Sequence, residues 1–152
     1  MHNAKCKMHN FFLQFCILHF AFFIAGCSIP NLEDPACTEA RTAVREFYSF
    51  HFGNNLAFAN EDLERRKEYL TSAFFESLRY QPRDVPPGVD PFTRTDDLPK
   101  AFRVGECREI TPGKAEFQVL LFWRDDVRSE QSEIKAVAVK QNDKWLLDSV
   151  TR

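Results

Sequence analysis

The side chains best suited to metal binding or nucleophilic chemistry are concentrated at the start of this sequence. Only one histidine, His51, and two cysteines, Cys37 and Cys107, follow position 27. The chain has no Cys-x-x-Cys pair, no glycine-rich phosphate loop and no recognisable Ser-His-Asp set. A single histidine gives little support to zinc sites built on histidine pairs or to histidine-centred catalysis. We therefore expect neither a metal nor a cofactor.

Residues 1–26 have the layout of a secretory signal peptide. Lys5 and Lys7 precede an apolar run from Phe11 to Ala25, and small residues follow it. The alternative is a retained membrane helix, but the run is about 15 residues long where a spanning helix needs about 20. Gln14 and His19 interrupt it, and Pro30 follows it. We expect a cleaved signal segment.

Cys27 closes the stretch Ile24-Ala25-Gly26-Cys27, which resembles the lipobox of bacterial lipoproteins. The resemblance implies cleavage before Cys27 and attachment of acyl chains to this residue. Several acyl chains anchor a protein stably where one chain would not. The alternative is a chance match that leaves Cys27 a plain thiol. We expect an exported envelope protein that is anchored by Cys27, faces the periplasm or the exterior, and has residues 27–33 as a short tether.

The charge of the chain without residues 1–26 argues against a nucleic-acid partner. Loss of Lys5 and Lys7 moves the formal net charge from −2 to about −4. This mildly acidic, mixed charge gives no sign of nucleic-acid binding.

In an oxidising compartment Cys37 and Cys107 could form a disulfide, and the alternative is two buried free thiols.

The chain after the tether begins with helical patterns. Asp34-Pro35 reads as a helix start, with Asp34 as N-cap and Pro35 at the first position, and Gly53 reads as its end. Between them apolar residues and His51 recur at helical spacing, so His51 should face the core or a pocket. Residues 60–80 predict one or two further helical pieces. We interpret the charge run through Arg65, Arg66 and Lys67 as a solvated face.

The second half of the chain predicts a long loop and then strands. Residues 81–100 hold five prolines and a glycine, so we expect a long loop that could carry specificity. A period of two follows from Ala101, with turns expected at 111–114, 125–126 and 142–143. Three to four antiparallel strands after helices predict one α+β domain over residues 34–152, with the helices packed on a curved sheet.

The order of elements resembles the nuclear transport factor 2-like, or cone, fold. Matching features are the closing Trp145-Leu146-Leu147-Asp148-Ser149-Val150, Phe47-Tyr48 in the first helix and Tyr69-Leu70-Thr71. More narrowly, the chain resembles the bacterial domain of unknown function 3828. Asp90-Pro91-Phe92 and Asp97 stand where that family has an Asp-x-Phe…Gln-Asp stretch, with Asp96 in place of the glutamine.

The cone fold implies a pocket between helices and sheet. In cone-fold isomerases and dehydratases such a pocket holds an aspartate base with a tyrosine or histidine partner, and its apolar walls shift pKa values toward neutrality. The catalytic candidates in this sequence are Tyr48, His51, Asp96 and Asp97. The candidates for the pocket lining are Phe47, Tyr48, His51, Tyr80, Phe92 and Trp123.

Three functions are compatible with these features. We favour a non-catalytic envelope lipoprotein that binds a small apolar ligand or an envelope protein. The second is a small cone-fold isomerase or dehydratase that uses Asp96 or Asp97 with His51 or Tyr48. The third is an interaction module that pairs through an open sheet face bearing Leu120 and Phe122, which would make it oligomeric. A filled interior would favour the third, and exposed Asp96 and Asp97 would exclude the second.

Overall fold

The computed structural model describes residues 33–54, 60–80 and 85–152 of the chain. Glu33–Arg152 forms one unit. The signal segment, Cys27 and most of the tether lie outside the described residues, so the predictions made for them stay predictions. Within the described part, no helix has the length and apolar character that spanning a membrane requires.

The first helix, α2 (Pro35–Gly53), has the predicted bounds. Asp34 is its N-cap, and the side-chain Oδ1 accepts a hydrogen bond from the backbone N–H of Ala36 at 2.8 Å. Proline at the first position lacks an N–H that the helix could not have paired. The buried stripe follows helical spacing and comprises Cys37, Ala40, Val44, Phe47, Tyr48 and His51.

Three short pieces occupy residues 60–80: α3 (Asn60–Glu64), the 3₁₀ turn η1 (Lys67–Tyr69) and α4 (Ser72–Tyr80). Thr71 precedes α4 and caps its start, because the Thr71 hydroxyl accepts from the N–H of Phe74 at 3.2 Å. The same hydroxyl donates to Asp148 Oδ1 at 2.9 Å, and the N–H of Thr71 donates to the carbonyl of Leu147. These bonds attach the short helices to the last strand.

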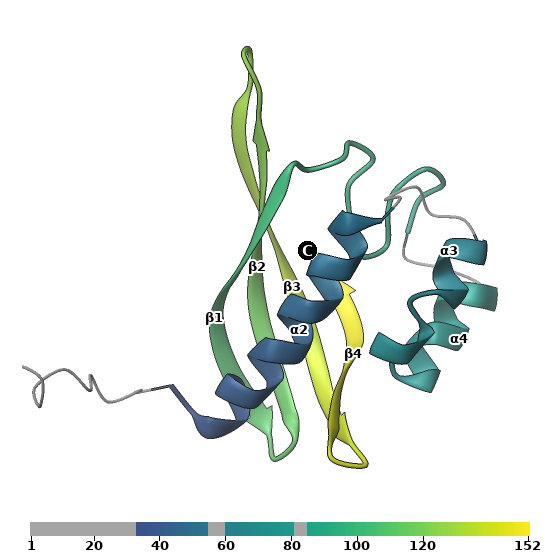
Figure 1. Ribbon diagram of the computed structural model, residues 1–152, viewed down its shortest axis with the longest axis vertical. Helices are drawn as coiled ribbons and strands as arrows, with labels where there is room; N and C mark the ends of the chain where they lie inside the picture. Colours follow the sequence, from purple (N-terminus) through teal and green to yellow (C-terminus); the bar gives the residue numbers. More distant parts are fainter. Residues whose placement is uncertain (1–32, 55–59, 81–84) are drawn as a thin grey trace, which may run out of the picture. The chain divides into compact units, whose positions relative to one another are not determined.

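Four antiparallel strands form one sheet in the order β1 (Ala101–Thr111), β2 (Lys114–Arg124), β3 (Ser129–Gln141) and β4 (Lys144–Thr151). The expected turns lie between them. Gly113 has φ 78°, and Asn142 and Asp143 have φ 49° and 62°, as tight hairpin turns require. The sheet with α2 against one face confirms an α+β fold (Figure 1).

The layer between α2 and the sheet is filled with side chains. Alternate residues of β2 and β3 point toward α2 and are fully buried, among them Phe117, Leu121 and Ile134. Phe47 and Tyr48 of α2 meet them and have 1% and 0% of their surfaces exposed. These residues belong to one continuous core. Close packing of this kind supports stability but leaves little room for a ligand among these side chains.

A disulfide joins Cys37 in the first turn of α2 to Cys107 in β1, with Cα atoms 5.8 Å apart. Arg41, one turn further along α2, donates to the carbonyls of Val104 and Gly105 at 3.0 and 2.6 Å. Its guanidinium also pairs with Glu33 and lies over the ring of Phe117. Covalent and polar contacts therefore attach the start of α2 to the sheet edge formed by β1.

We expect reduction of this disulfide to lower the free energy of unfolding by about 4 kcal/mol, because it frees a loop with a sequence separation of 70 residues. Urea denaturation with and without a dithiol reductant measures the difference. A C37A/C107A variant is the control and should not respond to reductant. Equal midpoints for the oxidised and reduced native protein would contradict the expectation.

Candidate functional site

A cluster of aromatic rings lies where the last turns of α2 meet the loop before β1. Phe47 stacks on His51 with ring centroids 5.8 Å apart and meets Tyr48 edge-on at 5.1 Å. Phe92 of the loop packs edge-on against both Phe47 (4.9 Å) and His51 (5.2 Å). Four of the predicted pocket-lining residues thus come together, and they contact one another.

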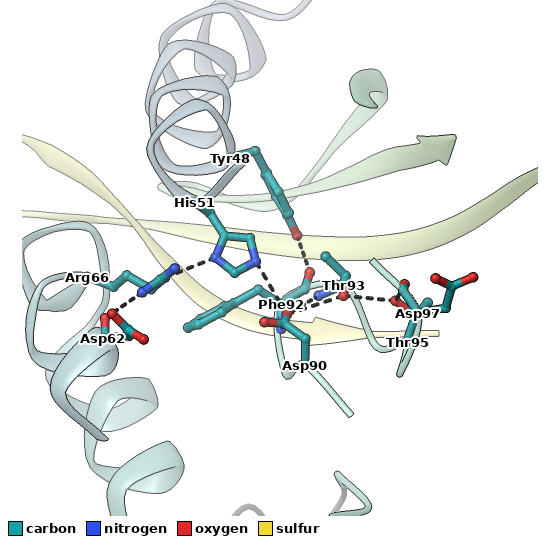
Figure 2. A network of polar contacts seen from close by, with 9 residues as sticks. All are labelled: Tyr48, His51, Asp62, Arg66, Asp90, Phe92, Thr93, Thr95 and Asp97. Atoms are coloured by element: carbon teal, nitrogen blue, oxygen red, sulfur yellow. Dashed lines mark hydrogen bonds and ion pairs between the residues drawn. The ribbon is translucent and has the colours of Figure 1, made fainter. Parts of the chain in front are cut away.

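A chain of polar contacts passes through this cluster and connects three segments (Figure 2). Arg66, between α3 and η1, donates from Nε to His51 Nδ1 at 2.9 Å. On the other side of the ring, His51 Nε2 lies 3.4 Å from Asp90 Oδ1. The exposed fractions of Arg66, His51 and Asp90 are 3%, 1% and 5%. We call these three residues the buried triad.

Asp90 also fixes the conformation of its own loop. Its Oδ1 accepts from the N–H groups of Phe92 and Thr93, both at 2.8 Å, and from the Thr93 hydroxyl at 3.3 Å. Its backbone N–H donates to the carbonyl of Thr95, and its carbonyl accepts from the N–H of Arg94. A short side chain that bonds backbone two and three residues ahead is typical of aspartate in turns.

The hydroxyl of Tyr48 adds a fourth attachment between α2 and this loop. It donates to the carbonyl of Phe92 at 2.9 Å. Burial, and then the nearby negative charge of Asp90, raise the pKa of Tyr48 well above its usual value. The phenol therefore stays protonated and remains a donor at ordinary pH.

The hydrogen bond from Arg66 sets the tautomer of the His51 ring. Burial lowers the pKa of Arg66, and the charges of Asp90 and Asp62 act in the opposite direction. An arginine nevertheless remains protonated in proteins. Because its Nε–H points at His51 Nδ1, that nitrogen must carry a lone pair, and the ring proton belongs on Nε2, facing Asp90.

This arrangement is poorly suited to acid–base catalysis. Both ring nitrogens of His51 face partners inside the protein, so the ring has no lone pair available to take a proton from a substrate. His51 Nε2 and Asp90 Oδ2 are buried and have no hydrogen-bond partner within the described residues. The 3.4 Å contact between His51 and Asp90 is thus an electrostatic contact rather than a well-formed hydrogen bond.

Several predicted site residues belong neither to the buried triad nor to its aromatic cluster. Asp96 and Asp97 are exposed, so neither can pair with His51 in an enclosed pocket; Asp97 instead forms an ion pair with Arg128. Tyr80, at the end of α4, is 71% exposed. Trp123 is buried in the core, but Arg128 covers its ring at 5.2 Å.

Sequence reasoning missed two members of the buried triad. Arg66 belongs to a charge run that we interpreted as a solvated face, and this interpretation was wrong for Arg66. The resemblance to the domain of unknown function 3828 includes Asp90 but gives it no role. The pattern Asp-Pro-Phe-Thr is an aspartate-initiated turn signal, and it is the one local feature that could have identified Asp90 as a structural residue.

One group of potential metal ligands occurs among the described residues. Glu33, Cys37 and Cys107 place a carboxylate oxygen and two sulfurs within 4.8 Å of one another. The two sulfurs are joined in the disulfide, and disulfide sulfurs are not the thiolates that bind zinc. The group therefore gives no support to a metal site in the oxidised protein.

No family model and no curated protein matches this sequence. Among solved structures, the chain is similar to a protein of unknown function from Bacteroides thetaiotaomicron, with a TM-score of 0.49 and 18% sequence identity. The match covers 76% of this chain and 90% of that chain. We base no conclusion on a likeness at this level.

We expect Asp90→Ala to lower the free energy of unfolding by about 3 kcal/mol or more. The substitution leaves two backbone N–H groups without their acceptor and removes the carboxylate that faces Arg66 and His51. Asp96→Ala, at an exposed position of the same loop, is the matched control and should have little effect. Chemical denaturation compares the two variants, and similar effects for both would contradict a structural role for Asp90.

The raised pKa of Tyr48 predicts a specific loss of stability in alkali. Above the ordinary tyrosine pKa of about 10 the unfolded chain releases a proton that folded Tyr48 retains, so stability falls as pH rises. Tyr48→Phe should lose about 1 kcal/mol at neutral pH and show a weaker decline in alkali. Tyr80→Phe, at an exposed site, should behave like the native protein in pH-dependent urea titrations. An unchanged decline in Tyr48→Phe would contradict this assignment.

Proposed function

We propose that this chain is a lipid-anchored envelope protein whose domain binds a protein partner and does not catalyse a reaction. The observation that carries the proposal is the close packing of side chains in the interior. The region where a cone-fold enzyme holds its acid–base pair is occupied by the aromatic cluster and by a histidine whose two nitrogens face Arg66 and Asp90. Close packing among the described residues of the interior favours recognition on the surface over a small apolar ligand inside.

The anchor rests on sequence features, and one structural feature supports export. The lipobox-like Ile24-Ala25-Gly26-Cys27 would carry the acyl chains, and the short tether would keep the domain close to the membrane. A disulfide between Cys37 and Cys107 is stable in an oxidising compartment such as the envelope. We assign the chain there, in the periplasm or at the cell exterior.

We also propose the nuclear transport factor 2-like cone as the finer description of the fold, and kinship with the domain of unknown function 3828. The order of a long helix, short helices, a loop and a four-stranded meander supports this proposal. So does the position of Trp145 and Val150 in the core of the last strand.

A cone-fold isomerase or dehydratase is the second candidate, and one observation favours it. Asp90 is a buried carboxylate next to His51, and its Oδ2 has no hydrogen-bond partner within the described residues. Asp90 would then replace Asp96 and Asp97 as the base. The burial of both groups and the bond from Arg66 to His51 favour the non-catalytic function.

Native purification from membranes tests this proposal. We expect intact mass spectrometry to find acyl chains on Cys27 and no apolar small molecule released on denaturation. Cys27→Ala should remove the acyl mass. A photo-reactive residue in place of exposed Leu98 should form a discrete protein adduct in membranes. A photo-reactive residue in place of exposed Gln141 probes a second position on the surface.

An unmodified Cys27 in the mature protein would contradict the anchor. A stoichiometric apolar molecule released from the purified protein would contradict a filled interior. Absence of any adduct from Leu98 and from Gln141 would contradict a protein-binding role.

A further inference from the structure

We propose that a surface hollow beside the Asp90 loop binds an acidic side chain of the protein partner. This inference rests on the proposed function and names the chemistry that the partner must present. The hollow has a volume of about 440 Å³ and is lined by Pro86, Val89, Arg94, Thr95, Asp96 and Arg152. Its residues come from two segments, the loop before β1 and the residue that follows β4.

The turn that begins at Asp90 orders one wall of the hollow. The backbone carbonyl of Asp90 accepts from Arg94 N–H at 2.7 Å, and the backbone N–H of Asp90 donates to Thr95 O at 2.9 Å. The Thr95 hydroxyl lies 3.1 Å from that of Thr93 and donates to the carbonyl of Asp97 at 2.8 Å. The loop is thus ordered before a ligand arrives, which lowers the entropic cost of binding.

Arg94 occupies a position that local backbone preference does not explain. Its φ of 59° is left-handed, where glycine or asparagine is favoured and other residues are strained. Strained residues held by their surroundings often serve a function. Here the loop places the guanidinium of Arg94 at the hollow, although glycine or asparagine would adopt this left-handed backbone with less strain.

The charges of the hollow favour a carboxylate. Arg94 and Arg152 provide two guanidinium groups, and a guanidinium binds a carboxylate through two parallel hydrogen bonds. An arginine has five N–H donors, so an interaction of Arg94 within the domain is compatible with a ligand.

The rest of the lining favours a peptide over a free anion. Pro86 and Val89 offer apolar surface for the methylene groups of a glutamate. Asp96 can accept N–H groups from a peptide backbone, and inorganic phosphate has no such groups to donate.

Two other hollows in the described part of the chain lack an excess of basic over acidic side chains. The hollow beside α2 has one basic and one acidic side chain in its lining, Arg45 and Glu46. The hollow on the sheet face away from α2 has three glutamates against Arg108 and Lys135. In both, the acidic groups equal or outnumber the basic ones, so neither favours an anionic ligand.

The binding test uses the full-length lipoprotein in detergent and a fluorescent peptide of five glutamates, with both ends blocked so that only side chains carry charge. We expect saturable binding by anisotropy, about tenfold weaker for Arg94→Asn and for Arg152→Gln. Asparagine tolerates a left-handed backbone, so the loop should keep its conformation and the protein its melting temperature. Arg103→Gln, at an exposed arginine of β1, is the matched control and should bind within about twofold of the native protein.

Three results would overturn the inference. The native protein could fail to bind the peptide, the two variants could bind it as well as the Arg103→Gln control does, or inorganic phosphate could displace it at equal concentration. The third result would mean that the hollow recognises a free anion.

Crosslinking from position 98 separates this inference from the proposed function. An adduct that disappears in Arg94→Asn supports the acidic-peptide site. An adduct that persists in Arg94→Asn overturns the site and leaves the partner-binding function intact. If the native protein forms no adduct from position 98 or from position 141, the proposed function fails as well.

Discussion

Burial of Arg66, His51 and Asp90 is the constraint on which the rest of this domain depends. A guanidinium and a carboxylate removed from water must be compensated by each other and by hydrogen bonds, since an unpaired buried charge costs several kcal/mol. His51 lies between them, and its ring can contact both only in the tautomer that carries the proton on Nε2. The three residues come from α2, the turn between α3 and η1, and the loop before β1, so one contact chain sets the positions of all three segments.

The two ends of α2 are attached to the fold by different chemistry. At the start, the disulfide and Arg41 join the helix to β1. At the end, His51 and Tyr48 join it to Arg66 and the Asp90 loop. The layer between these attachments is filled by aromatic and aliphatic side chains. Under our proposal the interior therefore serves as support, and recognition takes place on the surface of the loop that the interior holds.

Features governed by local chemistry could be predicted from the sequence. The cap and first-position proline define the start of α2, and strand alternation and turn residues define the hairpins. The triad depends on tertiary contacts that no local pattern encodes. Arg66 looks like one more exposed charge, and the turn signal at Asp90 does not reveal that its carboxylate will lie against His51. The proposed hollow is less predictable still, because Arg94 and Arg152 are far apart in the chain.

The protonation of His51 tests the central claim most directly. Only one histidine follows Cys27, so long-range proton–nitrogen NMR of the ring gives one assignable pattern in a protein that starts at Cys27. We predict the tautomer with an unprotonated Nδ1 and a protonated Nε2, as the bond from Arg66 requires. A ring with Nδ1 protonated and Nε2 bare would contradict the account, because it would place an available base next to Asp90 and restore the catalytic alternative.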